Sequence, residues 1–96
     1  MRMSNFEKDD VILIRENEHM HISIIDKIRI VSNYYTQISE KWYTLIEIYP
    51  NYNHEWTWDE VDYANPFSEI KKLYTTKKRG DSLLDEFQKK YPEYFV

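Results

Sequence analysis

Apolar side chains recur at every second position in the first half of the sequence, and this period of two most constrains the fold. Between residues 20 and 30, four isoleucines share one parity, as the inward side of a half-buried strand requires. Asp26 has the same parity and interrupts the pattern. We expect a β-bulge at residues 25–26 instead of a tight turn, because Asp-Lys lacks the glycine typical of two-residue hairpins.

Short apolar or aromatic segments on both sides extend this pattern into an antiparallel sheet. A polar connection of hairpin length, residues 16–19, precedes the isoleucine-rich strand. A turn at Ser32-Asn33 and a reversal at residues 39–41 separate the later segments, and Pro50 ends the last of them. The further predicted strands are residues 11–15, 34–38 and 42–49.

After Pro50 the sequence shows signals for helices. Thr57-Trp58-Asp59-Glu60 fits a capping box and predicts a helix over about residues 58–64. Asn65-Pro66 is a second start signal. Ser82-Leu83-Leu84-Asp85 is another capping box, and Pro92 ends or kinks the helix that follows it. The residues predicted to share one face of the second helix are Phe67, Ile70, Leu73 and Tyr74, and those of the last helix are Leu84, Phe87 and Tyr91.

The sequence therefore predicts a single α+β domain over residues 1–96. Its strands lie within about residues 11–49, and two or three helices within about residues 58–95 cover one face of a three- to four-stranded antiparallel sheet. A chain of 96 residues is large enough to fold without staples. It has no cysteine, no apolar leader and no run long enough to span a bilayer. We expect a cytoplasmic protein.

Charges are fully segregated between residues 51 and 80. The acidic part, residues 51–70, has no base, and the basic part, residues 71–80, has no acid. Acids at the start of a helix and bases at its end complement the helix dipole, which is the plain structural explanation of this segregation. That explanation leaves the two tryptophans of the acidic part unaccounted for. The acidic side chains are Glu55, Asp59, Glu60, Asp62 and Glu69, and the basic ones are Lys71, Lys72, Lys77, Lys78 and Arg79.

Aromatic residues form 17% of the chain, more than a small core encloses, so several rings must lie on the surface. Rigid rings with a polar tip are the side chains most enriched at binding hot spots. We expect one of Trp56 and Trp58 to be buried and the other to be accessible. The favoured function is an inhibitor or immunity-type antagonist, including one encoded by a phage or mobile element, that binds a basic cleft of a nucleic-acid-processing enzyme. The predicted partner-binding residues are Tyr52, Trp56, Trp58, Asp59, Glu60 and Asp62.

Two other functions remain open from the sequence. The first is a nucleic-acid-binding module in which Lys71, Lys72, Lys77, Lys78 and Arg79 follow a phosphate backbone. The net charge of −4 argues against it. The second is a homo-oligomeric structural subunit that uses the same rings at a symmetric interface.

Catalysis, metal binding and cofactors are not expected. His19 and His21 would lie on one face of a strand, but a zinc site needs three or four ligands, and only His54 and nearby carboxylates are left to complete it. The chain has one glycine and no phosphate-binding loop, and no serine or threonine lies in a nucleophile elbow. We therefore predict no catalytic residue, no metal ligand and no cofactor.

Overall fold

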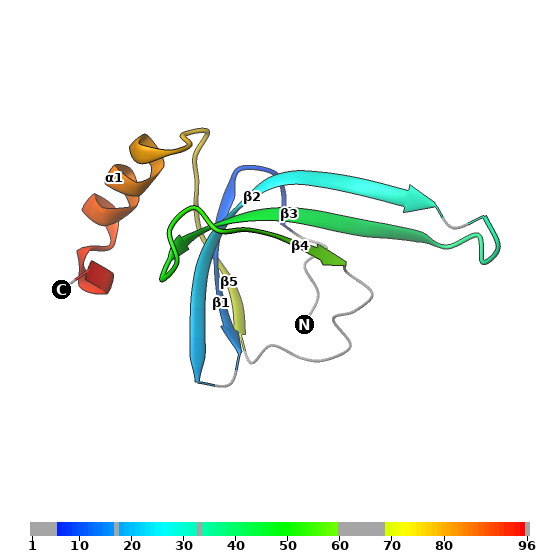
Figure 1. Ribbon diagram of the computed structural model, residues 1–96, viewed down its shortest axis with the longest axis horizontal. Coiled ribbons are helices and arrows are strands. Elements are labelled where there is room, and N and C mark those ends of the chain that lie inside the picture. Colours follow the sequence, from blue (N-terminus) through cyan, green and yellow to red (C-terminus); the bar gives the residue numbers. More distant parts are fainter. Residues whose placement is uncertain (1–5, 17, 33, 60–68, 96) are drawn as a thin grey trace.

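The described residues of the chain form a five-stranded antiparallel sheet with one α-helix near the C-terminal end (Figure 1). The computed structural model describes residues 6–16, 18–32, 34–59 and 69–95. Across the sheet the strands are ordered β4-β3-β2-β1-β5. The elements are β1 (Asp10–Glu16), β2 (His19–Ser32), β3 (Ser39–Tyr49), β4 (Glu55–Asp59), β5 (Glu69–Thr75), α1 (Asp81–Lys90) and the short 3-10 helix η2 (Pro92–Phe95).

The predicted balance of strands and helices is wrong. The described residues contain five strands, one α-helix and one short 3-10 helix, instead of three to four strands and two or three helices. Residues 55–59 form a strand on the edge of the sheet beside β3, so Thr57 is not a helix cap. Residues 69–75 form a strand beside β1, although Asn65-Pro66 suggested a helix there. Residues 60–68, where the first of these helices would lie, fall outside the described part.

The β-bulge in the long second strand is confirmed. Strand β2 runs from His19 to Ser32, and its register with β3 shifts between Ile25 and Lys27. The bulge marks a change in strand pairing. Residues of β2 before it pair with β1 and, from Ile22, also with β3, whereas residues after it pair with β3 alone.

The end of the sheet formed by β2 and β3 also differs from the prediction. Residues 34–38 were expected to be a strand, but 34–36 form a turn and 37–38 have no regular structure. Residues 39–41 begin β3 instead of reversing the chain. The two strands thus form one long hairpin that projects from the body of the molecule, on the side away from α1 (Figure 1).

The sheet buries side chains on both of its faces. The period of two sends neighbouring residues of β1 to opposite sides, so Ile12 and Ile14 enter one core cluster while Val11 and Leu13 enter the other. On the first face, which we call the indole face, the cluster also receives Trp56 and Trp58 from β4. On the second face, α1 completes the cluster with Leu83 and Phe87.

Helix α1 begins and ends close to where the sequence predicts. Its N-cap is Gly80, without a side-chain hydrogen bond, so the capping box predicted from Ser82 to Asp85 is wrong. Gly80 has a φ of 63°, a conformation that side chains with a Cβ rarely adopt. The helix ends before Pro92, as expected. No helix in the described part of the chain has the length and apolar character needed to cross a bilayer.

Candidate functional site

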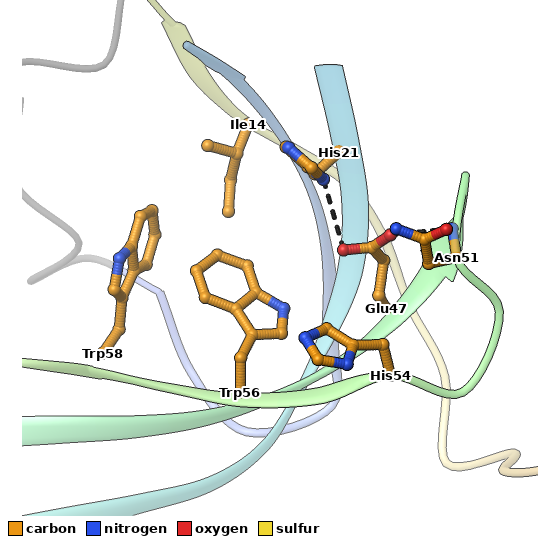
Figure 2. Close-up of a pocket in the computed structure, with 7 residues that line it drawn as sticks. All are labelled: Ile14, His21, Glu47, Asn51, His54, Trp56 and Trp58. Atoms are coloured by element: carbon orange, nitrogen blue, oxygen red, sulfur yellow. Dashed lines mark hydrogen bonds and ion pairs between the residues drawn. The ribbon is translucent and has the colours of Figure 1, made fainter. Parts of the chain in front are cut away.

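The indole face contains a pocket whose floor is the core of the sheet (Figure 2). Its volume is about 270 Å³. Side chains from β1, β2, β3, β4 and the loop between β3 and β4 contribute to it. We call it the Trp pocket and define it by its lining residues, Ile14, His21, Glu47, Asn51, His54, Trp56 and Trp58.

Strand β4 brings both indoles to the pocket. Residues two apart on a strand point to the same face, and Trp56 and Trp58 lie opposite Leu45 and Tyr43 of β3. The two rings meet edge to face, with centroids 4.8 Å apart. Both are partly buried against the core, so the expectation of one buried and one accessible indole is wrong. That expectation assumed a helix cap between them, where side chains need not point the same way.

Glu47 is the most unusual residue of the pocket, because its charged side chain is buried on the indole face of the sheet, with only 4% of it exposed. It follows Tyr43 and Leu45 on the same face of β3. The loop after the strand surrounds it: the backbone N–H of Asn51 donates to Glu47 Oε2 at 2.7 Å. The backbone of Glu47 is also fixed, since its N–H donates to the carbonyl of His54 and its carbonyl accepts from Asn53, each at 2.8 Å.

His21 contacts the other oxygen of this carboxylate. Its Nδ1 lies 3.2 Å from Glu47 Oε1, and the second ring nitrogen is turned away from Glu47 (Figure 2). A carboxylate on one imidazole nitrogen fixes the orientation of the ring. His21 also lies beside Trp56, with ring centroids 6.5 Å apart. The pocket therefore combines a fixed imidazole, a buried carboxylate and two indoles.

Trp56 contributes a donor as well as a ring. Its Nε1 is buried and has no hydrogen-bond partner within the described structure. The Oγ of Ser23, which is opposite Glu47 in the β2–β3 register, is in the same situation. Buried polar atoms are usually paired, so the neighbourhood of Glu47 is richer in polar groups than an ordinary core. The carboxylate suits a ligand group that brings hydrogen-bond donors and positive charge, whereas the N–H of Trp56 is a donor and needs an acceptor.

Among the predicted partner-binding residues whose side chains the structure describes, it brings Trp56 and Trp58 together but not Tyr52. Tyr52 instead donates a hydrogen bond from its hydroxyl to Asp81 Oδ1 at 3.2 Å, and partial desolvation together with that carboxylate raises its pKa. The backbone of Asp59 lies opposite Trp42 at the end of β4. Glu60 and Asp62 lie outside the described residues, so the acidic part of this surface stays a prediction.

Glu47 and the role of His21 were not predicted from the sequence. A signal for Glu47 existed, because it has the parity of Leu45 in a strand predicted to be an inner one. A charged residue on the buried side of an inner strand marks a polar site. His21 was considered only as a metal ligand beside His19. Within the ranges that the structure describes, no three His, Asp or Glu side chains are grouped to hold a metal ion.

The basic segment at residues 71–79 is largely engaged with carboxylates of the same chain. Arg79 contacts Asp9 at 2.6 Å and Asp26 at 2.9 Å. Burial alone would lower the pKa of Arg79, but the hydrogen bonds to Asp26 and Asp9 outweigh it and raise the pKa. Lys72 lies 3.5 Å from Asp10, and Lys78 lies 3.1 Å from Glu86. These contacts offset much of the positive charge that the nucleic-acid hypothesis requires.

A second surface was not anticipated from the sequence. We call the projecting part of the β2–β3 hairpin, residues 27–41, the arm. At its tip Tyr34 and Tyr35 are 88% and 92% exposed, with their rings edge to face and centroids 5.5 Å apart. Monomeric proteins rarely expose apolar side chains in such a group unless the group contacts something. The other large exposed apolar residues of the arm are Ile30, Val31 and Ile38.

Comparison with known protein families, with curated proteins and with solved structures found no match for this chain.

Proposed function

We propose that the protein is a small cytoplasmic binding protein, without catalytic activity, that acts as an antagonist by occupying the surface of a partner protein. The observation that carries this proposal is the arm, at whose tip two tyrosine side chains are almost fully exposed to solvent. Tyrosine brings a large contact area with few rotatable bonds, and it is enriched where protein interfaces are tightest.

The geometry of the arm supports insertion into a cleft. From Ile30 and Lys41 outward, β2 and β3 pair only with each other in the described structure. A two-stranded ribbon of this kind is thin, and it presents side chains on both of its faces. An apolar tip on a thin ribbon reaches surfaces that a flat sheet cannot.

The distribution of charge supports different roles for the arm and for the rest of the protein, which we call the body. The arm has three bases and one acid and therefore a net charge of +2. Because the whole chain has a net charge of −4, the remainder of the chain has a net charge of −6. An acidic body steers association toward a basic surface. We propose that the partner is a nucleic-acid-processing enzyme, that the acidic body faces its basic substrate cleft, and that the arm anchors the complex in a neighbouring apolar groove. Steering weakens as salt rises, whereas the apolar anchor does not.

Nucleic acid itself is the competing ligand for the arm, since cations and tyrosines also suit a phosphate backbone and stacked bases. Two observations favour a protein. The arm exposes Ile30, Val31 and Ile38, aliphatic side chains that contribute little to a phosphate contact. The net charge of the chain is −4, which opposes association with a polyanion.

The test is affinity capture followed by mass spectrometry, with three versions of the full chain. We expect the wild type to retain a partner that Tyr34→Ser/Tyr35→Ser loses, with affinity reduced by at least about tenfold. Tyr52→Ser is the matched comparison, because Tyr52 belongs to the surface predicted from sequence. It should retain the partner.

Three results would overturn the proposal. Equal capture by the arm variant and the wild type removes the arm from the interface. Loss of capture by Tyr52→Ser alone moves the interface to residues 52–62. A gel shift with single-stranded or duplex nucleic acid that the arm variant abolishes, without any captured protein, assigns the arm to nucleic acid.

A further inference from the structure

The carboxylate of Glu47 is a buried negative charge with little compensation. Its only ion-pair contact within the described residues is His21, at 3.2 Å, and no lysine or arginine there lies within ion-pair distance. Burying an ionised carboxylate is costly unless it is paired and hydrogen-bonded. The backbone N–H of Asn51, a neutral donor, supplies the other printed contact at 2.7 Å. A cation entering the pocket would offset the remaining cost.

The carboxylate has acceptor capacity left for such a cation. Two carboxylate oxygens offer about four lone-pair positions, and His21 and Asn51 each occupy one position, on different oxygens. One position on each oxygen is the arrangement to which a planar, two-pronged donor is matched. A guanidinium group presents its N–H donors in that fork, whereas an ammonium is a point charge.

The indoles favour the same chemistry. Trp56 and Trp58 line the pocket together with Glu47 (Figure 2). Tryptophan has the aromatic face that attracts cations best, and guanidinium groups also stack on it. The volume of about 270 Å³ lies below the range of roughly 300–1,000 Å³ typical of pockets for drug-sized ligands. It suits one functional group better than a whole large ligand.

We propose that the Trp pocket binds a guanidinium group, with Glu47 accepting its N–H donors and Trp56 and Trp58 providing ring faces. The group belongs either to a small free molecule or to an arginine residue of a polypeptide. The proposal does not depend on the arm, which lies at the other end of the β2–β3 hairpin from Glu47 and His21.

The test uses tryptophan fluorescence and the NMR signals of the indole N–H groups during titration of the full chain. The probes are agmatine and a capped Gly-Arg-Gly peptide, and the control is the same peptide with citrulline, a neutral group of nearly the same shape. We expect saturable binding of at least one guanidinium probe, at least about tenfold tighter than the citrulline peptide. Tighter binding of agmatine indicates a free ligand, and tighter binding of the peptide indicates an arginine residue.

A pair of variants locates the binding. Glu47→Gln keeps the shape of the side chain and removes its charge, and we expect it to weaken guanidinium binding by at least about tenfold. Glu55→Gln is the matched control, since it removes one exposed charge from β4 next to Trp56. It should bind as the wild type does. Tyr34→Ser/Tyr35→Ser should also bind normally, which separates this proposal from the function of the arm.

No saturable response to either guanidinium probe would overturn the proposal, as would binding of both guanidinium probes no tighter than that of the citrulline peptide. Both results come from the wild type, so they hold even if Glu47→Gln fails to fold. Equal losses in Glu47→Gln and Glu55→Gln would also overturn it, because they would indicate a general effect of net charge.

Discussion

At the scale of single residues, the position of Glu47 depends on backbone groups more than on other side chains. The loop after β3 places one N–H on its carboxylate and closes two further hydrogen bonds on its own backbone. Asn53 adopts a φ of 70° in this loop, a left-handed conformation that asparagine tolerates better than most residues. The loop therefore holds the Glu47 carboxylate at a position where an apolar side chain would pack more easily. A binding role for Glu47 accounts for a charged residue at this position.

Tyr74 makes the stability of the fold sensitive to alkaline pH. Burial first, and then the negative charge of Glu86, raise the pKa of Tyr74 above its usual value of 10.0. Above pH 10 the unfolded chain loses this proton while the folded chain keeps it, so the free energy of unfolding falls as pH rises. The loss is at most about 1.4 kcal/mol per pH unit, and less because the ring is partly exposed.

We expect Tyr74→Phe to reduce this alkaline loss. The measurement is urea denaturation at pH 7 and pH 11, with Tyr34→Phe as the control because Tyr34 is exposed. The control should lose as much stability as the wild type between the two pH values. If Tyr74→Phe loses as much as the control does, Tyr74 is not the group responsible.

The sequence predicts single residues well where one local pattern decides their position. The bulge at residues 25–26 is of this kind and is confirmed. The shared inward face of the four isoleucines is wrong, because the bulge reverses the faces after it: Ile22 and Ile24 lie on the α1 side, whereas Ile28 packs on the indole face and Ile30 is exposed. The contact between His21 and Glu47 could not be predicted in the same way, because it joins residues 26 apart in sequence. It depends on a register that only the folded sheet defines.

At the scale of elements, β5 shows why the C-terminal half was mistaken for helices. Ile70, Leu73 and Tyr74 have the spacing of a helix face. In the structure this spacing comes from an irregularity in the β1–β5 register, since Val11 pairs with Tyr74 but Ile12 pairs with Lys72. Leu73 is the extra residue, and both it and Tyr74 reach the α1 side while Ile70 stays on the indole face. A bulged strand buried on two faces thus imitates a helical period.

The pairing of β5 with β1 also lacks a local signal. More than fifty residues separate these strands in sequence, and the turn residues between them do not specify which edge of the sheet the chain joins. The last helix was predictable because Leu84, Phe87 and Pro92 follow one another closely, and Phe87 is fully buried as expected.

Arg79 ties three elements together, and we predict that it is structural. Its guanidinium joins Asp9 before β1 to Asp26 in the bulge of β2, from the segment between β5 and α1. Arg79→Met would leave two partly buried carboxylates without their partner. We expect it to lower the free energy of unfolding by about 1–3 kcal/mol, measured by urea denaturation.

Lys77→Met is the matched control for this prediction, because Lys77 is exposed and lies two residues away. We expect its effect to stay within about 0.5 kcal/mol. A fully stable Arg79→Met protein would contradict the structural role and would return Arg79 to the candidates for nucleic-acid binding.

At the scale of the whole molecule, the body and the arm have different characters. The body has buried clusters on both faces of its sheet, whereas the arm exposes its largest apolar side chains. A folding requirement does not explain that exposure, because the strands of the body pair without the tip. An interface does explain it, since exposed apolar groups gain stability when a partner removes them from water.

The most direct measurement of this account is site-specific photo-crosslinking of the intact protein in its native cell extract. A photoreactive phenylalanine analogue replaces Tyr35 at the tip of the arm or, in the control, Gln88 on the exposed side of α1. We predict that the probe at position 35 forms a crosslink to one partner protein and that the probe at position 88 does not. Absence of a protein crosslink at position 35 in the folded protein, or the same products from both positions, would contradict the claim that the arm binds a partner.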